Sequence, residues 1–165
     1  MIRIVEAPNE IKIQKTIKLF LAGGITDVED WQSYVIDRLL EDSESKLHDY
    51  LTNVVVFNPR RGHFTMNDVD NQIEWEYNKL KEADVICFWF AGGTPNPIVL
   101  FEYGNFGFGN IPVVVGVDVG GVRSYERVYD VEIQTKLRRP DRIINYNLKD
   151  FYYNILKEIK KLNKK

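Results

Sequence analysis

Glu102 is the only charged residue in a long apolar part of the sequence. Between Asp84 and Asp118 no other side chain carries a formal charge, and Glu102 lies within 98–104, where the other residues are typical of a protein core. An ionised carboxylate is costly to bury without partners. We therefore interpret Glu102 as a residue kept for chemistry. The alternative is a carboxylate stabilised by the positive end of a helix that begins shortly before it.

A second acid, Glu76, is available for chemistry that needs two carboxyl groups. In the helix predicted over 70–83, Glu76 lies closer to the apolar stripe than Glu74 does, and Gln72 shares its side one turn earlier. Two carboxyl groups in different environments can divide the roles of ionised and protonated group. The alternative for Glu76 is a solvated carboxylate at the edge of an amphipathic helix.

The same helix carries a large aromatic residue on its other side. The pattern places Ile73, Tyr77 and Leu80 inward, which makes Trp75 point outward. An exposed tryptophan is unusual on a monomer surface and suggests a subunit interface.

Strands alternate with helices along the chain. The predicted strands are 17–22, 53–57, 85–90, 111–117 and 143–144. Four helices are predicted: one that opens at a Thr26–Glu29 capping box, one over 70–83, one that begins at Pro97 with Asn96 as its N-cap, and one over 147–162. Residues 1–14 suggest an extended or hairpin-like lead-in, and 118–142 form a polar stretch. The pattern predicts one α/β domain over residues 1–165, a doubly wound parallel sheet of about five strands that is flavodoxin-like or Rossmann-like.

Such sheets bind ligands beyond the carboxyl ends of their strands, near the topological switch point. That rule gathers residues that are scattered in the sequence at one edge of the sheet. They are Gly23, Gly24, Arg60, Arg61, 92–96, Glu102 and Asp118.

Composition excludes several classes of function. The chain has 165 residues, 44% hydrophobic and 28% charged, and a formal net charge of -2 leaves no electrostatic footprint for nucleic acid. No membrane span or signal peptide is predicted, which favours the cytoplasm. Cys87 is expected in the core. His48 and His63 are far apart in the sequence and have no Cys or His partner at metal-binding spacing, so no metal site is predicted. Without a P-loop or a dinucleotide fingerprint, no cofactor is predicted.

Four motifs together resemble a known family. They are Phe20-Leu21-Ala22-Gly23-Gly24, Asn58-Pro59-Arg60-Arg61, Gln72-Ile73-Glu74-Trp75-Glu76, and Phe101-Glu102-Tyr103-Gly104 after a Gly-Gly-Thr-Pro loop. In order and spacing, over 17–117, they are similar to the nucleoside 2-deoxyribosyltransferases and their relatives, which include nucleoside 5'-monophosphate N-glycosidases.

The resemblance implies an enzyme that acts on the N-glycosidic bond of a nucleoside or nucleotide, by transfer or by hydrolysis. It makes Glu102 the nucleophile, places Glu76 near the nucleobase, and puts Asn96 where well-studied members have an aspartate. Base protonation would then rest on Glu76 or Glu74. A homo-oligomer is implied as well, and the loop with Arg123, Ser124, Tyr125 and Arg127 is a candidate for ligand contacts.

Other candidate substrate-binding residues lie in the same motifs. They are Phe20, where many members have a tyrosine, together with Gly23, Gly24 and Gln72. Arg60 and Arg61 could bind a phosphate bidentately, or form a salt bridge in a solvent-facing turn. A catalytically idle nucleotide-binding module and, more weakly, a flavin binder remain alternatives.

Overall fold

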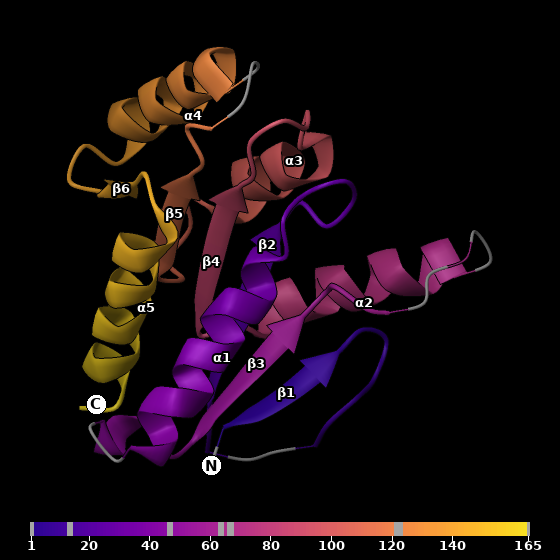
Figure 1. Ribbon diagram of the computed structural model, residues 1–165, viewed down its shortest axis with the longest axis vertical. Helices are drawn as coiled ribbons and strands as arrows, with labels where there is room; N and C mark the ends of the chain where they lie inside the picture. Colours follow the sequence, from indigo (N-terminus) through magenta and orange to yellow (C-terminus); the bar gives the residue numbers. More distant parts are fainter. Residues whose placement is uncertain are drawn as a thin grey trace.

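A single parallel sheet of six strands forms the centre of the protein (Figure 1). The computed structural model describes residues 2–12, 15–45, 48–62, 65, 68–120 and 124–164, with only the backbone described for 124–128. The strands are β1 (Arg3–Glu6), β2 (Ile17–Gly23), β3 (Val54–Asn58), β4 (Val85–Phe90), β5 (Val113–Val117) and β6 (Ile144–Asn145). The predicted α/β class is confirmed, with six strands rather than about five.

The additional strand is β1, at one edge of the sheet. It pairs in parallel with β3, with Arg3 opposite Val55 and Glu6 opposite Asn58. Of the two expected forms of the lead-in, extended or hairpin-like, residues 3–6 take the extended one. Met1, Ile13 and Gln14 lie outside the described residues. The partner of β1 is about 50 residues away in the sequence, so no local pattern could reveal the pairing.

The order of the other five strands is that of a flavodoxin-like sheet. The full order is β1-β3-β2-β4-β5-β6, and all pairs are parallel. From β2 the chain goes first to β3 on one side, and it then returns to place β4 on the other side. The topological switch point therefore lies between β2 and β4, where a ligand crevice is expected at the carboxyl ends.

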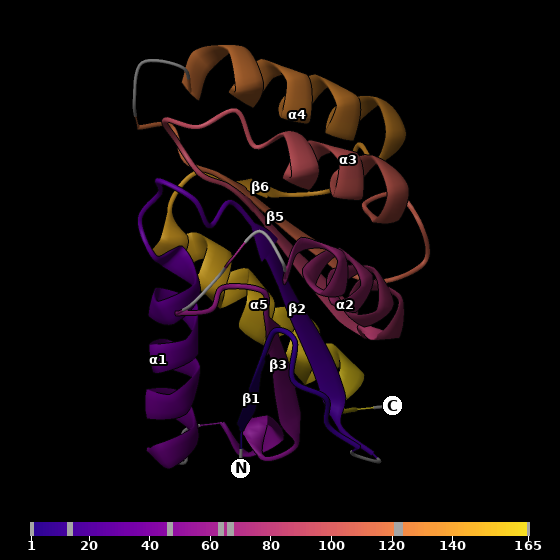
Figure 2. The ribbon, with the colours of Figure 1, turned by 90° about the vertical axis from the view of Figure 1, so that its right-hand side faces the viewer.

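Helices cover both faces of the sheet (Figure 2). On one face lie α1 (Trp31–Glu44) and α5 (Leu148–Leu162), and on the other lie α2 (Val69–Glu82), α3 (Pro97–Phe106) and α4 (Ser124–Arg138); a short 3-10 turn, Asp49–Leu51, precedes β3. Side chains of β4 alternate between the two cores and are all buried. This explains its continuous apolar sequence.

The core beneath α1 and α5 is built around aromatic rings. Trp31 lies 6.4 Å from Trp89 and 6.0 Å from Phe151, measured between ring centroids. Cys87 is fully buried in the same core, as expected. Burial raises the pKa of its thiol, so Cys87 acts here as a small apolar residue.

Two helix predictions need correction. α1 begins at Trp31, and Asp30 caps it by accepting a hydrogen bond from the Ser33 amide, so the expected Thr26–Glu29 capping box is wrong. α4 lies in the stretch expected to be merely polar. Its sequence hides the helix because, of its side chains that are described (129–138), few are buried; Val131 and Thr135 are two that are.

The buried face of α2 also differs from the prediction. Ile73 and Tyr77 are 60% and 53% exposed, whereas Trp75 is only 4% exposed. Trp75 packs 6.1 Å from Phe20, ring to ring, and its indole nitrogen donates to the carbonyl of Asn9 at 2.8 Å. The chain after β1 thus covers a side of α2 that the helical pattern alone assigned to solvent.

Candidate active site

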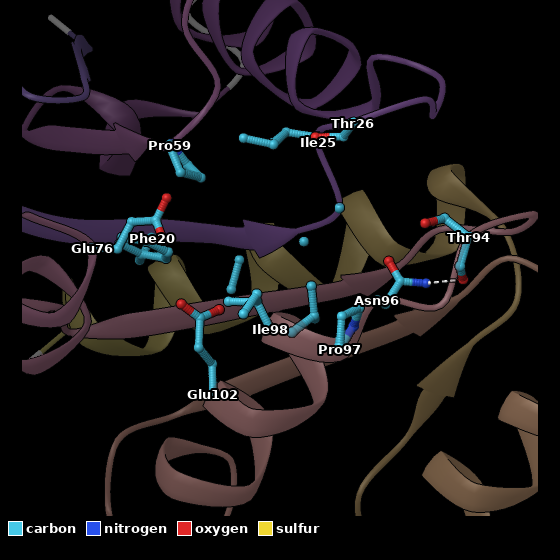
Figure 3. Close-up of a pocket in the computed structure, with 14 residues that line it drawn as sticks. Phe20, Ile25, Thr26, Pro59, Glu76, Thr94, Asn96, Pro97, Ile98 and Glu102 are labelled. Carbon is cyan, nitrogen blue, oxygen red and sulfur yellow. Dashed lines mark hydrogen bonds between the residues drawn. The ribbon is translucent and has the colours of Figure 1, made fainter. Parts of the chain in front are cut away.

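A cavity of about 330 Å³ opens at the carboxyl ends of β2 and β4, at the switch point (Figure 3). Its walls come from β2 and the loop after it, from the residue that follows β3, from α2, from the loop before α3, and from α3 itself. The lining residues are Phe20, Ala22, Gly23, Gly24, Ile25, Thr26, Pro59, Glu76, Thr94, Asn96, Pro97, Ile98, Val99 and Glu102. Six of the nine predicted site residues are therefore brought together: Phe20, Gly23, Gly24, Glu76, Asn96 and Glu102.

Glu102 enters this cavity from the second turn of α3. Its helix begins at Pro97 as predicted, behind Asn96 at the N-cap position. The carboxyl group is largely buried and makes no hydrogen bond or ion pair with the residues that the structure describes. Burial, and then the negative charge of Glu76, raise the pKa of Glu102 to about 8.

Glu76 reaches the cavity from α2, and its carboxyl group lies opposite that of Glu102 (Figure 3). Its Oε1 accepts a hydrogen bond from Nε2 of Gln72 at 2.5 Å. Burial raises the pKa of Glu76, while this hydrogen bond and the charge of Arg61 act to lower it. Glu74, the other candidate acid on α2, is exposed and outside the cavity.

The two carboxyl groups are electrostatically coupled. Each has its pKa raised by burial, and the charge of Glu76 raises that of Glu102 further. Two interacting acids lose their protons in steps that belong to the pair. With one pKa at about 8, the pair retains a proton near neutral pH in the absence of ligand.

Asn96 closes the other end of the cavity. Its Nδ2 donates to the carbonyls of Ala91 and Thr94, at 2.7 and 3.0 Å. These acceptors fix the orientation of the amide, and they leave its Oδ1 buried without a partner among the described residues. The backbone is left-handed, with φ 47°, and the side chain does not cap the helix. Asn96 therefore holds the loop and presents an acceptor oxygen.

The glycine pair at the end of β2 allows two close approaches. A Cβ atom at Gly24 would lie 2.7 Å from Oδ1 of Asn96, and one at Gly23 would lie 2.4 Å from the Trp31 ring. Phe20 is 1% exposed and brings an aromatic ring to the floor, with no hydroxyl group to orient a carboxylate. The floor of the cavity is thus apolar, and the polar atoms stand at its sides.

Three predicted residues lie outside the cavity lining. Nε of Arg60 lies 3.1 Å from Oδ1 of Asp30 and donates to Gln32 at 3.1 Å, toward α1. Arg61 lies 3.8 Å from the Asp68 carboxylate. Gln72 is buried behind Glu76. Both arginines lie at the predicted edge of the sheet but outside the cavity lining, and the charge of Arg61 acts on Glu76 within it.

Several lining residues were missed by sequence reasoning. Thr94 belongs to the stretch 92–96, which was expected at this edge. Pro59, Ile98 and Ile25 were not named as site residues and also line the cavity, as does Thr26, which was expected in a capping box. They have no distinctive chemistry, and only their position at strand ends could have indicated them. Arg123 lies outside the described residues, and no side-chain position is described for Ser124, Tyr125 or Arg127.

The described part of the chain lacks a metal-binding cluster and a helix that could span a membrane. Within the described ranges, no three His, Cys, Asp or Glu side chains are grouped so that they could hold a metal ion. His63 falls outside those ranges. Among the helices of the described chain, none combines the length and the apolar character needed to cross a bilayer.

Comparison with known proteins identifies the family. A family model described as nucleoside 2-deoxyribosyltransferase like matches residues 16–120, well over half of the chain. The chain belongs to this family, which confirms the resemblance noted in its motifs. No curated protein matches it in sequence.

The fold has a counterpart among solved structures. The crystal structure of a conserved protein from Enterococcus faecalis V583 superposes with a TM-score of 0.54 at 13% identity, over 90% of this chain and 99% of that one. At this identity the likeness extends to the fold alone.

Proposed function

We propose that this protein cleaves the N-glycosidic bond of a nucleoside, with Glu102 as the nucleophile and Glu76 as the acid. The observation that carries the proposal is the pairing of these two carboxyl groups across one cavity at the switch point. Membership of the nucleoside 2-deoxyribosyltransferase-like family supports the substrate class.

The reaction proceeds in two displacements. A carboxylate oxygen of Glu102 attacks the anomeric carbon, the bond from that carbon to the base nitrogen breaks, and the base takes a proton from Glu76. In the second step an acceptor base or water attacks the same carbon, breaks its ester bond to Glu102, and returns a proton to Glu76. The chemistry needs one ionised and one protonated carboxyl group, which is the proton count expected for the pair near neutral pH.

Before catalysis the proton must move within the pair. In the free protein the high pKa of Glu102 favours its protonated form, whereas attack requires its carboxylate. Sugar hydroxyl groups donating to Glu102 would stabilise that carboxylate, and a base nitrogen near Glu76 would favour the proton there. Substrate binding itself thus sets the working protonation state.

The cavity favours an unphosphorylated nucleoside over a 5'-monophosphate. No Lys, Arg or His is among the described residues that line it, and two of those residues are acids. Arg60, the clearest candidate for a phosphate contact, pairs with Asp30 instead. A dianionic phosphate would meet like charge with no described cationic side chain in the lining, whereas sugar hydroxyl groups can donate to Glu102 and to Oδ1 of Asn96.

We also propose that the protein forms a homo-oligomer. Three large hydrophobic side chains on α2 and α3, outside the cavity lining, are more than half exposed: Ile73 (60%), Tyr77 (53%) and Phe101 (70%). Exposed apolar surface of this kind suits contact with a second copy of the chain. Light scattering on the wild type and on Phe101→Ser tests it, because only an oligomer that uses this face would dissociate in the variant.

The direct test is chromatographic detection of free base from a panel of nucleosides and 5'-monophosphates, with and without an acceptor base. Base release that is lost in Glu102→Ala is the expected result, and its dependence on acceptor separates transfer from hydrolysis. Tight binding without turnover across the panel would replace the proposal with a nucleotide-binding module.

A further inference from the structure

Gln72 is buried behind Glu76 and donates both of its amide hydrogens in hydrogen bonds. Nε2 donates to the carbonyl of Pro59 at 2.9 Å and to Oε1 of Glu76 at 2.5 Å, and the side chain as a whole is 6% exposed. Pro59 follows β3 and lines the cavity itself. Gln72 therefore ties the carboxyl group of Glu76 to the edge of the sheet.

The orientation of the Gln72 amide is fixed by its surroundings. The Pro59 carbonyl can only accept a hydrogen bond, so the nitrogen of the amide must face it. The amide oxygen is then left on the other side, where it is buried with no partner in the described chain. An acceptor held without a partner is unfavourable, so this arrangement gains nothing from Gln72 Oε1 and depends on the two donated bonds.

This contact distinguishes the two oxygens of Glu76. A protonated carboxyl group has one oxygen that accepts and one that donates. The Gln72 amide hydrogen needs an acceptor, so Oε1 takes that role and the proton resides on Oε2. We propose that Gln72 is a positioning residue, which engages Oε1 of Glu76 so that Oε2 carries the proton delivered to the departing base. This inference rests on the proposed function of Glu76.

Two charged groups also bear on Glu76. The positive charge of Arg61, from the loop after β3, lowers the pKa of Glu76, and Glu102 faces it from α3. The hydrogen bond from Gln72 acts in the same direction as Arg61, because it stabilises the ionised form. Loss of Gln72 is expected to raise the pKa of Glu76. Glu76 would then be less ionised, and its smaller negative charge should lower the pKa of Glu102.

The first experiment measures those titrations without any substrate. Carboxyl ¹³C NMR of glutamate-labelled protein gives the midpoints in wild type and in Gln72→Met, with Glu76→Gln and Glu102→Gln to assign the signals. Asn78→Met, an exposed amide on the same helix, is the matched control. The expected result is an upward shift of the Glu76 midpoint in Gln72→Met alone. Unchanged midpoints in a folded Gln72→Met protein would overturn the proposal.

The second experiment compares two leaving groups. A purine deoxynucleoside needs a proton on its base, whereas a nitrophenyl deoxyriboside releases a stable anion without one. Gln72→Met should lose about tenfold in kcat on the nucleoside and less than about twofold on the nitrophenyl compound, because only the first uses general acid catalysis. Equal losses on both would reduce Gln72 to a structural role and overturn the proposal.

The two experiments test different claims, so the proposed function and the role of Gln72 can be contradicted independently. If the wild type turns over neither compound, the proposed function falls, while the titration still decides whether Gln72 controls Glu76. A shifted titration with no split between leaving groups would contradict proton delivery through Glu76.

Discussion

α2 and α3 each bring one carboxyl group to the cavity, but they support it differently. On α2, Glu76 is held by Gln72, which is itself bound to the end of β3. On α3, Glu102 has no hydrogen bond from the described residues, and only burial and the charge of Glu76 act on its pKa. A supported acid can hold a proton in a fixed place. An unsupported carboxyl group is suited to react, because a ligand can supply the interactions that the protein withholds.

The largest effect is expected from removing Glu102, the carboxyl group without a hydrogen bond from the described residues. Glu102→Ala should abolish base release, by at least about 10³-fold, because no carboxylate remains to trap the sugar. Circular dichroism should show an intact fold, since the side chain makes no hydrogen bond or ion pair in the described structure. Substantial activity in a folded variant would exclude Glu102 as the nucleophile.

Removal of the supported acid should cost less and should also move the pH profile. Glu76→Gln keeps the size of the side chain and removes its proton and charge, so a loss of about 10²-fold in kcat is expected. With the charge gone, the pKa of Glu102 should fall below its value of about 8. The limb of kcat/KM against pH that reports ionisation of Glu102 should therefore move to lower pH. A limb that stays in place would show that the two acids are not coupled.

The pH dependence of thermal stability should reveal the raised pKa of Glu102 without a substrate. A carboxyl group whose pKa rises from 4.5 to about 8 on folding binds its proton more tightly in the folded state, so its contribution to stability is full below pH 4.5 and is lost as pH rises toward 8. Glu102→Gln should therefore have a higher Tm than wild type at pH 8, and the gain should shrink toward pH 5. Thermal scans at both pH values measure it, with the exposed Glu74→Gln as control. A gain that does not depend on pH would refute the raised pKa.

The smallest effect is expected outside the cavity. Arg60→Gln loses a partly exposed pair with Asp30, so the free energy of unfolding should fall by less than about 1 kcal/mol. The KM for nucleosides should not change, because Arg60 does not line the cavity. A rise in KM confined to monophosphates would instead restore the phosphate contact that the sequence suggested for Arg60 and Arg61.

Much of the fold was predictable because the central strands are apolar along their whole length. β2, β3 and β4 were found from such runs, and the rule for parallel sheets then placed their carboxyl ends together. The glycines at the end of β2 and the acid of α3 were thereby placed beside one another, although about 80 residues separate them in the sequence. Chain order was enough for this step.

What could not be predicted depends on contacts between distant segments. β1 pairs with a strand far away in sequence, and the chain that follows it buries Trp75, which the helical pattern had placed in solvent. The direction of Arg60 is set by Asp30 and Gln32 from another helix. In each case the partner, rather than the residue itself, decides where the side chain goes.

Each of the two amides of the site is oriented by hydrogen bonds that include main-chain carbonyl acceptors. Gln72 donates to Pro59, and Asn96 donates to Ala91 and Thr94. A carbonyl oxygen is present whatever side chain its residue bears, so substitutions at 91 or 94 that keep the backbone path would leave the orientation of Asn96 intact. The geometry of this site is consequently buffered against mutation in its loops, and selection can vary the loop surface that a substrate meets without displacing the chemistry beneath it.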